Sequence, residues 1–293
     1  MLEKFTTKKR TTGADFKYTI LIPTWNNMEF LKLCIGSIKK NSYFRHQIIV
    51  IVNEGKDGTS EWVDSQQDID YVHSHKNIGI CYGLNSARSL IKTNYIVYAN
   101  DDMYFLPDWD LEFHNEIEKI GHQNFMLSGT MIEPDNTGNP CVIVANYGRS
   151  VSDFKEEKLL CEFNTYIKAD WNGSTWPPNI VPLALWDLVG GMSIEFSPGF
   201  YSDPDLSMKL WQIGVRHFKG LGKSRVYHFG SKSTNRIRIN NGKKIFLKKW
   251  GISSNFFTTK YLKRGGDFSL LSNPQITKWE SFVNKLKRIK SVL

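Results

Sequence analysis

Several patterns that would classify a protein at once are missing from this sequence of 293 residues. No apolar run approaches the roughly 20 residues of a membrane-spanning helix, and no signal-peptide pattern opens the chain. The four cysteines are widely spaced and form no CxxC pair, which argues against zinc and against a disulfide framework. We interpret them as buried thiols in a reducing compartment and therefore expect a cytoplasmic protein. No internal repeat or low-complexity linker is visible.

Acidic residues are scarce in the last third of the chain. Between Lys209 and Leu293, 20 Lys and Arg residues face only two acids, which gives a net charge of +18, whereas the whole chain carries +9. Such a region predicts an anionic partner: a nucleotide diphosphate, lipid head groups, an acidic polymer or nucleic acid.

The end of this basic region has the pattern of an amphipathic helix. Its apolar positions share one helical face: Ile276, Trp279, Phe282, Val283, Leu286, Ile289 and Leu293. Lysines and arginines occupy the other faces, which is typical of a helix that lies on an anionic membrane surface. A terminal helix packed on its own domain gives the same pattern, and we rank that interpretation first.

The most informative segment is Tyr95–Asp102, YIVYANDD. Its apolar run predicts a buried strand that ends in Asn100, Asp101 and Asp102. Adjacent carboxylates at the end of a buried strand repel each other, and a divalent cation such as Mg²⁺ or Mn²⁺ would neutralise them. A solvated turn that caps the next helix explains the pair alone equally well.

Strands and helices alternate through the first hundred residues. Strands are expected at 18–22, 47–52, 69–72 and 95–99, with helices from Glu29, from Gly58 and over 79–91. This order predicts a parallel sheet covered by helices on both faces, with the ligand outside the carboxyl ends of the strands. Polar residues follow three strands at those ends: Pro23-Thr24, Asn53-Glu54 and Asn100-Asp101-Asp102.

Four segments then carry a family resemblance: ILIPTWNNMEFLKLCIGSI, IIVIVNEGKDGTSEWV, NIGICYGLNSA and YIVYANDDMYFLPDW. In order and spacing they resemble glycosyltransferase family 2 over roughly residues 17–110. The resemblance implies an α/β A-type glycosyltransferase fold, with a mixed, mostly parallel central sheet, and inverting, metal-dependent transfer from a nucleotide-diphosphate sugar.

The resemblance also implies roles for individual residues. Asp102 would be the metal ligand of the Asp-x-Asp motif, with Asp101 beside it and Asn100 in place of the first Asp. The nucleotide would contact Pro23, Thr24, Asn77, Gly79, Asn100 and Asp101, with the Asn100 amide hydrogen-bonded to a ribose hydroxyl. Asn53, followed by Glu54, replaces the acid that reads the base, which leaves uracil, thymine and guanine open, with a UDP sugar favoured.

In the second half, SPGFYSDPDLSMKL resembles the family motif that carries the general base. Matched by position, the base is Asp203, with Asp205 as the fallback. On residues alone, Asp203 at the N-cap of a helix with Pro204 at its first position is simply a cap, and the helix dipole would keep it ionised. If Asp203 is the base, Asp205 is expected on the acceptor side.

Further candidates are His228 as a second metal ligand and Lys232 and Arg236 as diphosphate ligands. Their alternatives are a core histidine and a basic surface loop. Trp171 and Trp176 could stack on acceptor sugars or fill a gap in the core, and the Gly190-Gly191 pair suggests a close backbone approach on the acceptor side.

We therefore expect a flexible tail (1–16), a catalytic domain (17–240, divided at 128/129 into nucleotide and acceptor halves) and a basic helical extension (241–293). The predicted function is an inverting glycosyltransferase with Mn²⁺ or Mg²⁺ and a saccharide or lipid-linked acceptor, in polysaccharide or glycolipid assembly. No nucleic acid partner is expected. The alternatives are a degenerate scaffold that acts as a membrane or polyanion adaptor and, below it, a nucleotidyltransferase, which would carry a Gly-rich phosphate loop after its first strand.

Overall fold

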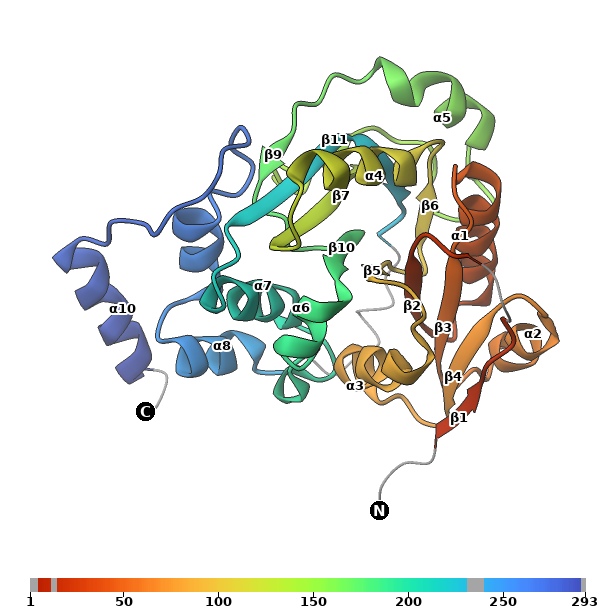
Figure 1. Cartoon of the computed structure of the whole chain (residues 1–293), viewed down its shortest axis with the longest axis horizontal. Coiled ribbons are helices and arrows are strands. Elements are labelled where there is room, and N and C mark those ends of the chain that lie inside the picture. The colour runs from red at the N-terminus through yellow and green to blue at the C-terminus, as the bar shows by residue number, and fades with distance from the viewer. Residues whose placement is uncertain (1–4, 12–14, 231–239, 291–293) are drawn as a thin grey trace.

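The computed structural model describes residues 5–11, 15–230 and 240–290, which form a mixed sheet between layers of helices (Figure 1). The strands are β1 (Phe5–Lys8), β2 (Thr19–Trp25), β3 (Gln47–Asn53), β4 (Asp70–Ser74), β5 (Tyr95–Tyr98), β6 (Met103–Phe105), β7 (Phe125–Glu133), β8 (Ile143–Val144), β9 (Trp171–Asn172), β10 (Asn179–Pro182) and β11 (His217–His228).

The α-helices are α1 (Met28–Asn41), α2 (Thr59–Ser65), α3 (Gly79–Ser86), α4 (Trp109–Ile120), α5 (Glu156–Glu162), α6 (Leu183–Leu188), α7 (Ser202–Gln212), α8 (Gly242–Trp250), α9 (Ser254–Phe256) and α10 (Lys278–Lys290). Shorter helical turns are η1 (Ala87–Leu90), η2 (Phe163–Thr165), η3 (Ile194–Phe196) and the π-helical η5 (Phe257–Tyr261). The single helix expected over 79–91 is therefore divided into α3 and η1.

The sheet order is β1-β4-β3-β2-β5-β10-β7-β11-β6, with β8 paired to β7 and β9 to β11. Strands β4, β3, β2 and β5 are parallel, as the sequence predicted, and β10 runs antiparallel between β5 and β7. The mixed, mostly parallel sheet covered by helices confirms the predicted fold class.

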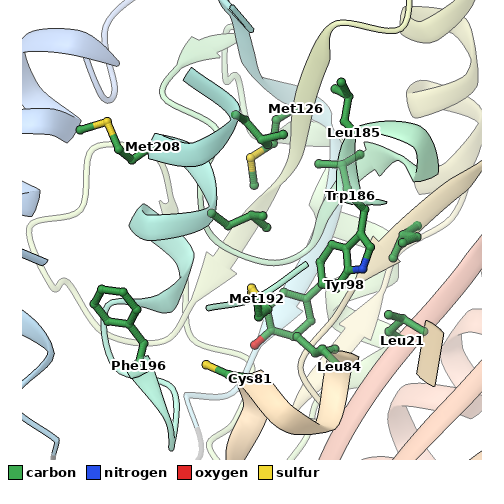
Figure 2. Packing of buried hydrophobic residues seen from close by; sticks show 14 of the residues in the cluster. Leu21, Cys81, Leu84, Tyr98, Met126, Leu185, Trp186, Met192, Phe196 and Met208 are labelled. Atoms are coloured by element: carbon green, nitrogen blue, oxygen red, sulfur yellow. The ribbon is translucent and has the colours of Figure 1, made fainter. Parts of the chain in front are cut away.

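Alternate residues of the strands point to opposite faces of the sheet, and each face is buried by its own helices. On β2, Ile20 and Ile22 pack toward α1 and α4, whereas Leu21 packs toward α3, α6 and α7. Figure 2 shows part of the cluster that contains Leu21, in which Tyr98 lies close to Trp186 and Met192. Two buried apolar layers hold the strand ends in fixed positions.

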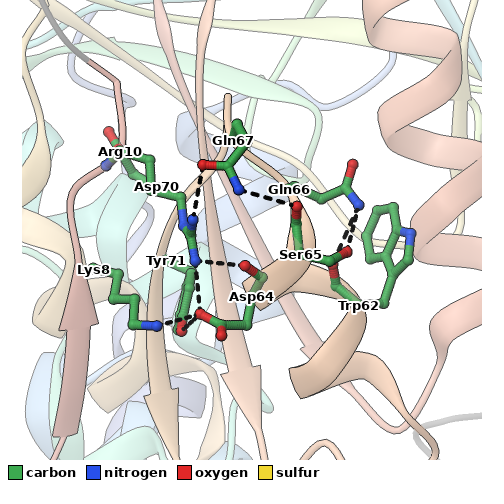
Figure 3. Close-up of polar contacts among 9 residues, drawn as sticks. All are labelled: Lys8, Arg10, Trp62, Asp64, Ser65, Gln66, Gln67, Asp70 and Tyr71. Atoms are coloured by element: carbon green, nitrogen blue, oxygen red, sulfur yellow. Dashed lines mark hydrogen bonds and ion pairs between the residues drawn. The ribbon is translucent and has the colours of Figure 1, made fainter.

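The segment for which we expected a flexible tail contains an edge strand. β1 pairs antiparallel with β4, and the Arg10 backbone N–H donates to Asp70 Oδ1 over 2.6 Å. Figure 3 shows Lys8 and Arg10 paired with the Asp64 carboxylate, 2.7 Å from Arg10 Nη2. These ion pairs and the strand pairing order residues 5–11, which local composition could not predict.

The expected C-terminal extension does not behave as one unit. Phe246 of α8 and Phe257 of η5 are buried in the same cluster as α7, so this part of the chain completes the main core. Helix α10 contacts the rest of the protein on the side of the buried Asn284, and Glu280 of this helix forms an ion pair of 2.5 Å with Lys260. Its apolar face stays exposed, which contradicts packing of that face on the domain: Ile276, Trp279, Phe282, Leu286 and Ile289.

Of the four cysteines, Cys34, Cys81 and Cys141 are buried free thiols, as expected, whereas Cys161 is exposed. None of the helices in residues 5–11, 15–230 and 240–290 combines the length and the apolar character that a membrane crossing requires.

Candidate active site

The polar ends of β2, β3 and β5 line one cavity of about 280 Å³, which we call the strand-end cavity. Its walls include most of the residues to which the sequence assigned a nucleotide or metal role: Pro23, Thr24, Asn53, Asn77, Gly79, Asn100, Asp101, Asp102 and His228. The structure therefore brings together residues from five separate segments of the chain.

The sheet register explains how His228 reaches the carboxylates. At the end of β11, His228 pairs with Met103 of β6, so that it lies beside Asp102, whose carbonyl accepts a 3.1 Å bond from the Phe229 N–H. On its other side β11 runs parallel to β7, which ends at Glu133. Two neighbouring strands thus deliver one carboxylate to each side of the imidazole.

Both imidazole nitrogens have carboxylate neighbours. Nδ1 of His228 is 2.8 Å from Glu133 Oε1, and Nε2 is 3.4 Å from Asp102 Oδ1. Burial alone would lower the pKa of His228, but the charges of Asp102 and Glu133 outweigh it and raise the pKa to about 10. On β2, the Thr24 hydroxyl donates to Asp101 Oδ2 over 2.7 Å, which fixes the orientation of that carboxylate.

This donor set fits a divalent cation that is shared with a substrate phosphate. The described residues contain no group of three or more His, Cys, Asp or Glu side chains that could hold a metal by themselves. They do offer Asp102 and His228 Nε2 side by side, while Glu133 orients the imidazole from behind, as carboxylates commonly do for ligating histidines. A bound cation would replace the proton on Nε2, because a histidine ligand must be neutral at the ligating nitrogen. Mg²⁺ and Mn²⁺ typically take one or two protein ligands and complete their shell with water and phosphate oxygens.

The Asn77–Ile80 loop closes the strand-end cavity against Pro198. Gly79 has φ +76°, and a Cβ at this position would lie 2.6 Å from Pro198 Cα. The Ile80 N–H donates to the Pro198 carbonyl over 2.7 Å, and the Asn77 side chain accepts from the Gly79 N–H over 2.9 Å. Only glycine permits this approach, so the Asn-x-Gly pattern has a geometric cause.

A second cavity, of about 570 Å³, adjoins the first and contains Asp203; we call it the α7 cavity. The two share Ile80, Asn100, Pro198 and His228 as lining residues. Helix α7 begins at Ser202 and Tyr201 is its N-cap, so Asp203 is the second helical residue and not the cap. Ser202, which stands where the family carries Glu, donates its hydroxyl to the Gly199 carbonyl over 2.6 Å.

The carboxylate of Asp203 is held in an unusual environment. Its Oδ1 is buried and has no hydrogen-bond partner among the described residues. Burial raises the pKa of Asp203 from 3.8 to about 7, contrary to our expectation that the helix dipole would keep it ionised. A carboxylate with a pKa near neutrality is well suited to accept a proton from a hydroxyl.

Glu54 and Trp171 are among the predicted residues that lie outside both cavities. Glu54 accepts hydrogen bonds from Trp25 Nε1 and Asn26 Nδ2, over 2.9 and 3.1 Å, so it positions Trp25, which does line the strand-end cavity. Trp171 is buried against Gly220 and donates its Nε1–H to Thr130 over 2.9 Å. It fills the core, whereas Trp176 lines the α7 cavity.

The remaining acceptor candidates, Gly190, Gly191 and Asp205, lie outside the cavities, and Gly191 and Asp205 make structural contacts instead. Gly191 permits a close approach, but to Asn85, whose Oδ1 would be 2.4 Å from a Cβ at this position, and neither it nor Gly190 is among the cavity residues. Asp205 is fully buried, 2.9 Å from Lys249 Nζ, and accepts from Trp250 Nε1 over 2.7 Å. Lys232 and Arg236 lie outside the described residues.

Sequence reasoning missed several residues that the structure brings to these cavities. Trp25 and Ile80 lie one residue from predicted positions, so closer attention to neighbours would have found them. Glu133 and Arg264 carry no local signal, because only the pairing of distant segments brings them to the site.

The chain belongs to glycosyl transferase family 2, whose family model matches residues 19–172, just over half of the sequence. The matched region includes β2 to β5 and the Asn-Asp-Asp turn. This is a family of glycosyltransferase enzymes, and membership confirms the resemblance that the four segments indicated.

Curated relatives match over shorter stretches. The uncharacterised glycosyltransferase MG025 of Mycoplasma genitalium is 31% identical over 107 residues, which cover 32% of this chain and 34% of that protein. WcaA of Escherichia coli, named for colanic acid biosynthesis, is 28% identical over 98 residues, or 31% of this chain and 34% of WcaA. The matches thus span about a third of the length of these relatives.

Solved structures support the fold over most of the chain. TarS 1–349 of S. aureus, in complex with UDP-GlcNAc, superimposes with a TM-score of 0.59 at 11% identity and covers 94% of this chain and 72% of that chain. GalNAc-T7 with UDP, GalNAc and Mn²⁺ gives a TM-score of 0.56 at 12% identity, covering 79% and 48%. At such identity the likeness concerns the fold, which is the A-type glycosyltransferase fold that the sequence predicted.

Proposed function

We propose that this chain is an inverting glycosyltransferase that binds a nucleotide-diphosphate sugar in the strand-end cavity and the acceptor in the α7 cavity. The observation that carries the proposal is the common wall of the two cavities, formed by Ile80, Asn100, Pro198 and His228. The carboxylates of Asp101 and Asp102 line one side of that wall, and Asp203 lines the other. A donor and an acceptor in these cavities would therefore meet beside Asp203.

The donor is most consistent with a UDP sugar. TarS and GalNAc-T7 share the fold and have been solved with UDP-GlcNAc and with UDP, respectively, which supports uracil as the base. GalNAc-T7 also holds Mn²⁺, which supports a divalent cation here, with Asp102 and His228 as its protein ligands. When bound, such a cation would neutralise negative charge on the leaving diphosphate.

The residues of the chain then have distinct tasks in the transfer. Asp203 takes the proton from the acceptor hydroxyl while that oxygen forms a bond to the anomeric carbon of the donor sugar. The bond between that carbon and the diphosphate oxygen breaks, and the nucleoside diphosphate leaves with the electron pair. Attack on the face opposite the leaving group inverts the anomeric configuration. Pro23, Thr24 and Asn77 would hold the nucleotide in place during the reaction.

The product class is a polysaccharide or a glycolipid. WcaA is named for the biosynthesis of a polysaccharide, and an acceptor on a growing polymer or a lipid carrier suits a cavity whose wall includes Ser254, Asn255, Thr258 and Arg264 of the basic last third.

Calorimetric titration with UDP, dTDP, GDP and CDP, each with and without Mn²⁺, tests this proposal. The wild-type protein is expected to bind one of them, UDP, in a Mn²⁺-dependent manner, and Asp102→Ala is expected to lose that binding. Asp68→Ala is the matched control, because Asp68 is an exposed carboxylate outside both cavities. Binding that ignores the metal and Asp102 would refute the transferase site.

We further propose that α10 attaches the enzyme to an anionic membrane surface on the cytoplasmic side. Trp279 and Phe282 are 70% and 50% exposed, and Lys278, Lys285 and Lys287 of the same helix are exposed as well. Exposed aromatic residues next to lysines match the apolar and anionic layers of a lipid surface.

Vesicle sedimentation tests the attachment. Wild-type protein is expected to sediment with vesicles of phosphatidylglycerol and not with pure phosphatidylcholine, and the double variant Trp279→Ser, Phe282→Ser should stay in the supernatant. The control is Tyr43→Ser, which removes an exposed aromatic residue far from α10 in the sequence. Equal sedimentation of the wild type and the double variant would refute this role of α10.

A further inference from the structure

Arg264 has an unusual position in the α7 cavity. The charged side chains of the described cavity wall are Glu133, Asp203, His228 and Arg264. His228 lies between the carboxylates of Asp102 and Glu133. Arg264, by contrast, makes no ion pair with any described residue, and its Nε is buried without a hydrogen-bond partner there.

The buried Nε of Arg264 is held at a cost, and the terminal nitrogens of its guanidinium group, which donate to no described residue, are left for a ligand. The guanidinium group stays ionised at any physiological pH, and a buried N–H without a partner costs about 1–3 kcal/mol. Proteins usually satisfy such groups internally, as this one does for Arg225, whose Nε and Nη2 donate to the carbonyls of Gly222 and Tyr166 over 2.8 and 2.7 Å. Arg264 has no comparable partner within residues 5–11, 15–230 and 240–290.

The backbone around Arg264 is firmly held. The Arg264 N–H donates to the Thr258 carbonyl over 3.0 Å, and the Gly265 N–H donates to the Asn172 carbonyl over 2.9 Å. Gly173, at φ +97°, lets the chain pass so closely that a Cβ at this position would lie 2.8 Å from Arg264 Cα. The position of Arg264 is thus set by contacts between two segments about ninety residues apart in the sequence.

The side chain is also oriented. Its guanidinium carbon lies 5.4 Å from the centroid of the Trp176 ring, within the range of a cation–π contact, and Trp176 lines the same cavity. Aromatic residues elsewhere in the wall, Tyr98 and Tyr201, suit the faces of sugar rings. A cavity of this composition offers an apolar surface for a saccharide and one fixed cation.

We propose that the acceptor carries an oxyanion, a phosphate or a carboxylate, which Arg264 binds while the reacting hydroxyl lies at Asp203. Both groups accept two parallel hydrogen bonds from a guanidinium. The carboxylates of Glu133 and Asp203 repel an anion from their part of the wall, which comes from other segments of the chain, so the acceptor has one favoured orientation. The assignment of this cavity to the acceptor rests on the proposed function; binding of an oxyanion at Arg264 does not.

Binding of three small probes tests the inference: glucose, glucuronate and glucose 6-phosphate, measured by saturation-transfer NMR and calorimetry on the full chain. The wild type is expected to bind at least one of the two anions about tenfold more tightly than glucose. A preference for glucuronate alone identifies a carboxylate acceptor, and a preference for glucose 6-phosphate alone identifies a phosphate. Equal binding of all three probes, or no binding of either anion, would overturn the inference.

Variants locate the effect. Arg264→Gln should reduce the ratio of anion affinity to glucose affinity to about one. Lys263→Gln removes the same charge from an exposed neighbour outside the cavity wall and should leave that ratio unchanged. Preference retained in Arg264→Gln would contradict the role of Arg264. Thermal unfolding of the same variant reports its folding; should it fail to fold, Arg264→Lys replaces it and must lose most of the preference.

UDP titration of the wild-type protein separates the two proposals. Anion binding through Arg264 without any nucleotide binding would mean that the transferase proposal fails while the oxyanion site stands. Nucleotide binding without anion preference would mean the reverse.

Discussion

Replacement of Asp203 by Asn should abolish sugar transfer and at the same time stabilise the folded protein at pH 8. The two effects have one cause. The carboxylate is held in a buried environment without a hydrogen-bond partner for Oδ1 among the described residues, which raises its pKa to about 7. Asparagine has nearly the same shape, cannot accept the proton of the acceptor hydroxyl, and carries no charge to bury.

The size and sign of the stability effect follow from linkage. The folded protein binds the Asp203 proton more tightly than the unfolded chain, so this group lowers stability as the pH rises from about 4 to about 7. A shift from 3.8 to about 7, at about 1.4 kcal/mol per pKa unit, sets an upper limit of about 4 kcal/mol at pH 8. Because Asp203 retains some solvent exposure although its Oδ1 is buried, we expect a gain of about 1–3 kcal/mol, and a smaller gain at pH 5.

Urea unfolding at pH 5 and pH 8, together with a transfer assay, measures both effects. Asp205→Asn is the matched control: it removes a carboxylate two residues away that pairs with Lys249 and accepts from Trp250, so it should destabilise the protein at both pH values. An Asp203→Asn variant that is less stable than wild type at pH 8, or that retains wild-type turnover, would refute the reasoning.

Three further outcomes are expected. The wild-type kcat/KM should rise about tenfold per pH unit up to about pH 7 and then level off, as Asp203 becomes ionised; a flat rate profile from pH 5 to 8 would exclude it as the base. Glu133→Gln should weaken Mn²⁺-dependent UDP binding about 10–100-fold in calorimetry, because Glu133 orients His228; unchanged affinity would contradict that role. Gly79→Ala should lose UDP binding and lower the thermal midpoint, because a Cβ there meets Pro198, whereas Gly138→Ala, with open space around it, should keep UDP binding.

The nucleotide side of the fold was predictable because its signals are local. β2, β3 and β5 are short apolar runs, each followed at once by polar residues, and parallel strands carry such residues to one edge of the sheet. The periodicity that predicts the helices of this half and the resemblance to family 2 both come from roughly residues 17–110, so each supports the other.

The other side depended on pairing between distant segments. β11 contains the buried cations Lys219 and Arg225, and a strand with buried charges has no recognisable sequence pattern. Lys219 is accommodated by Glu116, 2.8 Å away, and this partner is apparent only in the folded chain. For the same reason Glu133 and Arg264 escaped notice, and Trp171, which resembles an exposed loop residue in the sequence, fills the core over Gly220.

The wall that carries Arg264 comes from residues that follow the last strand of the central sheet, whereas the nucleotide is expected among the ends of β2, β3 and β5. On the proposed assignment of the α7 cavity to the acceptor, substitutions along residues 254–264 would change acceptor selectivity without altering a strand or the donor site. With this arrangement, substitutions that affect acceptor binding would be separate from those that affect donor binding. The proposed acceptor site makes residues 254–264 the first segment to vary in engineering a new acceptor specificity.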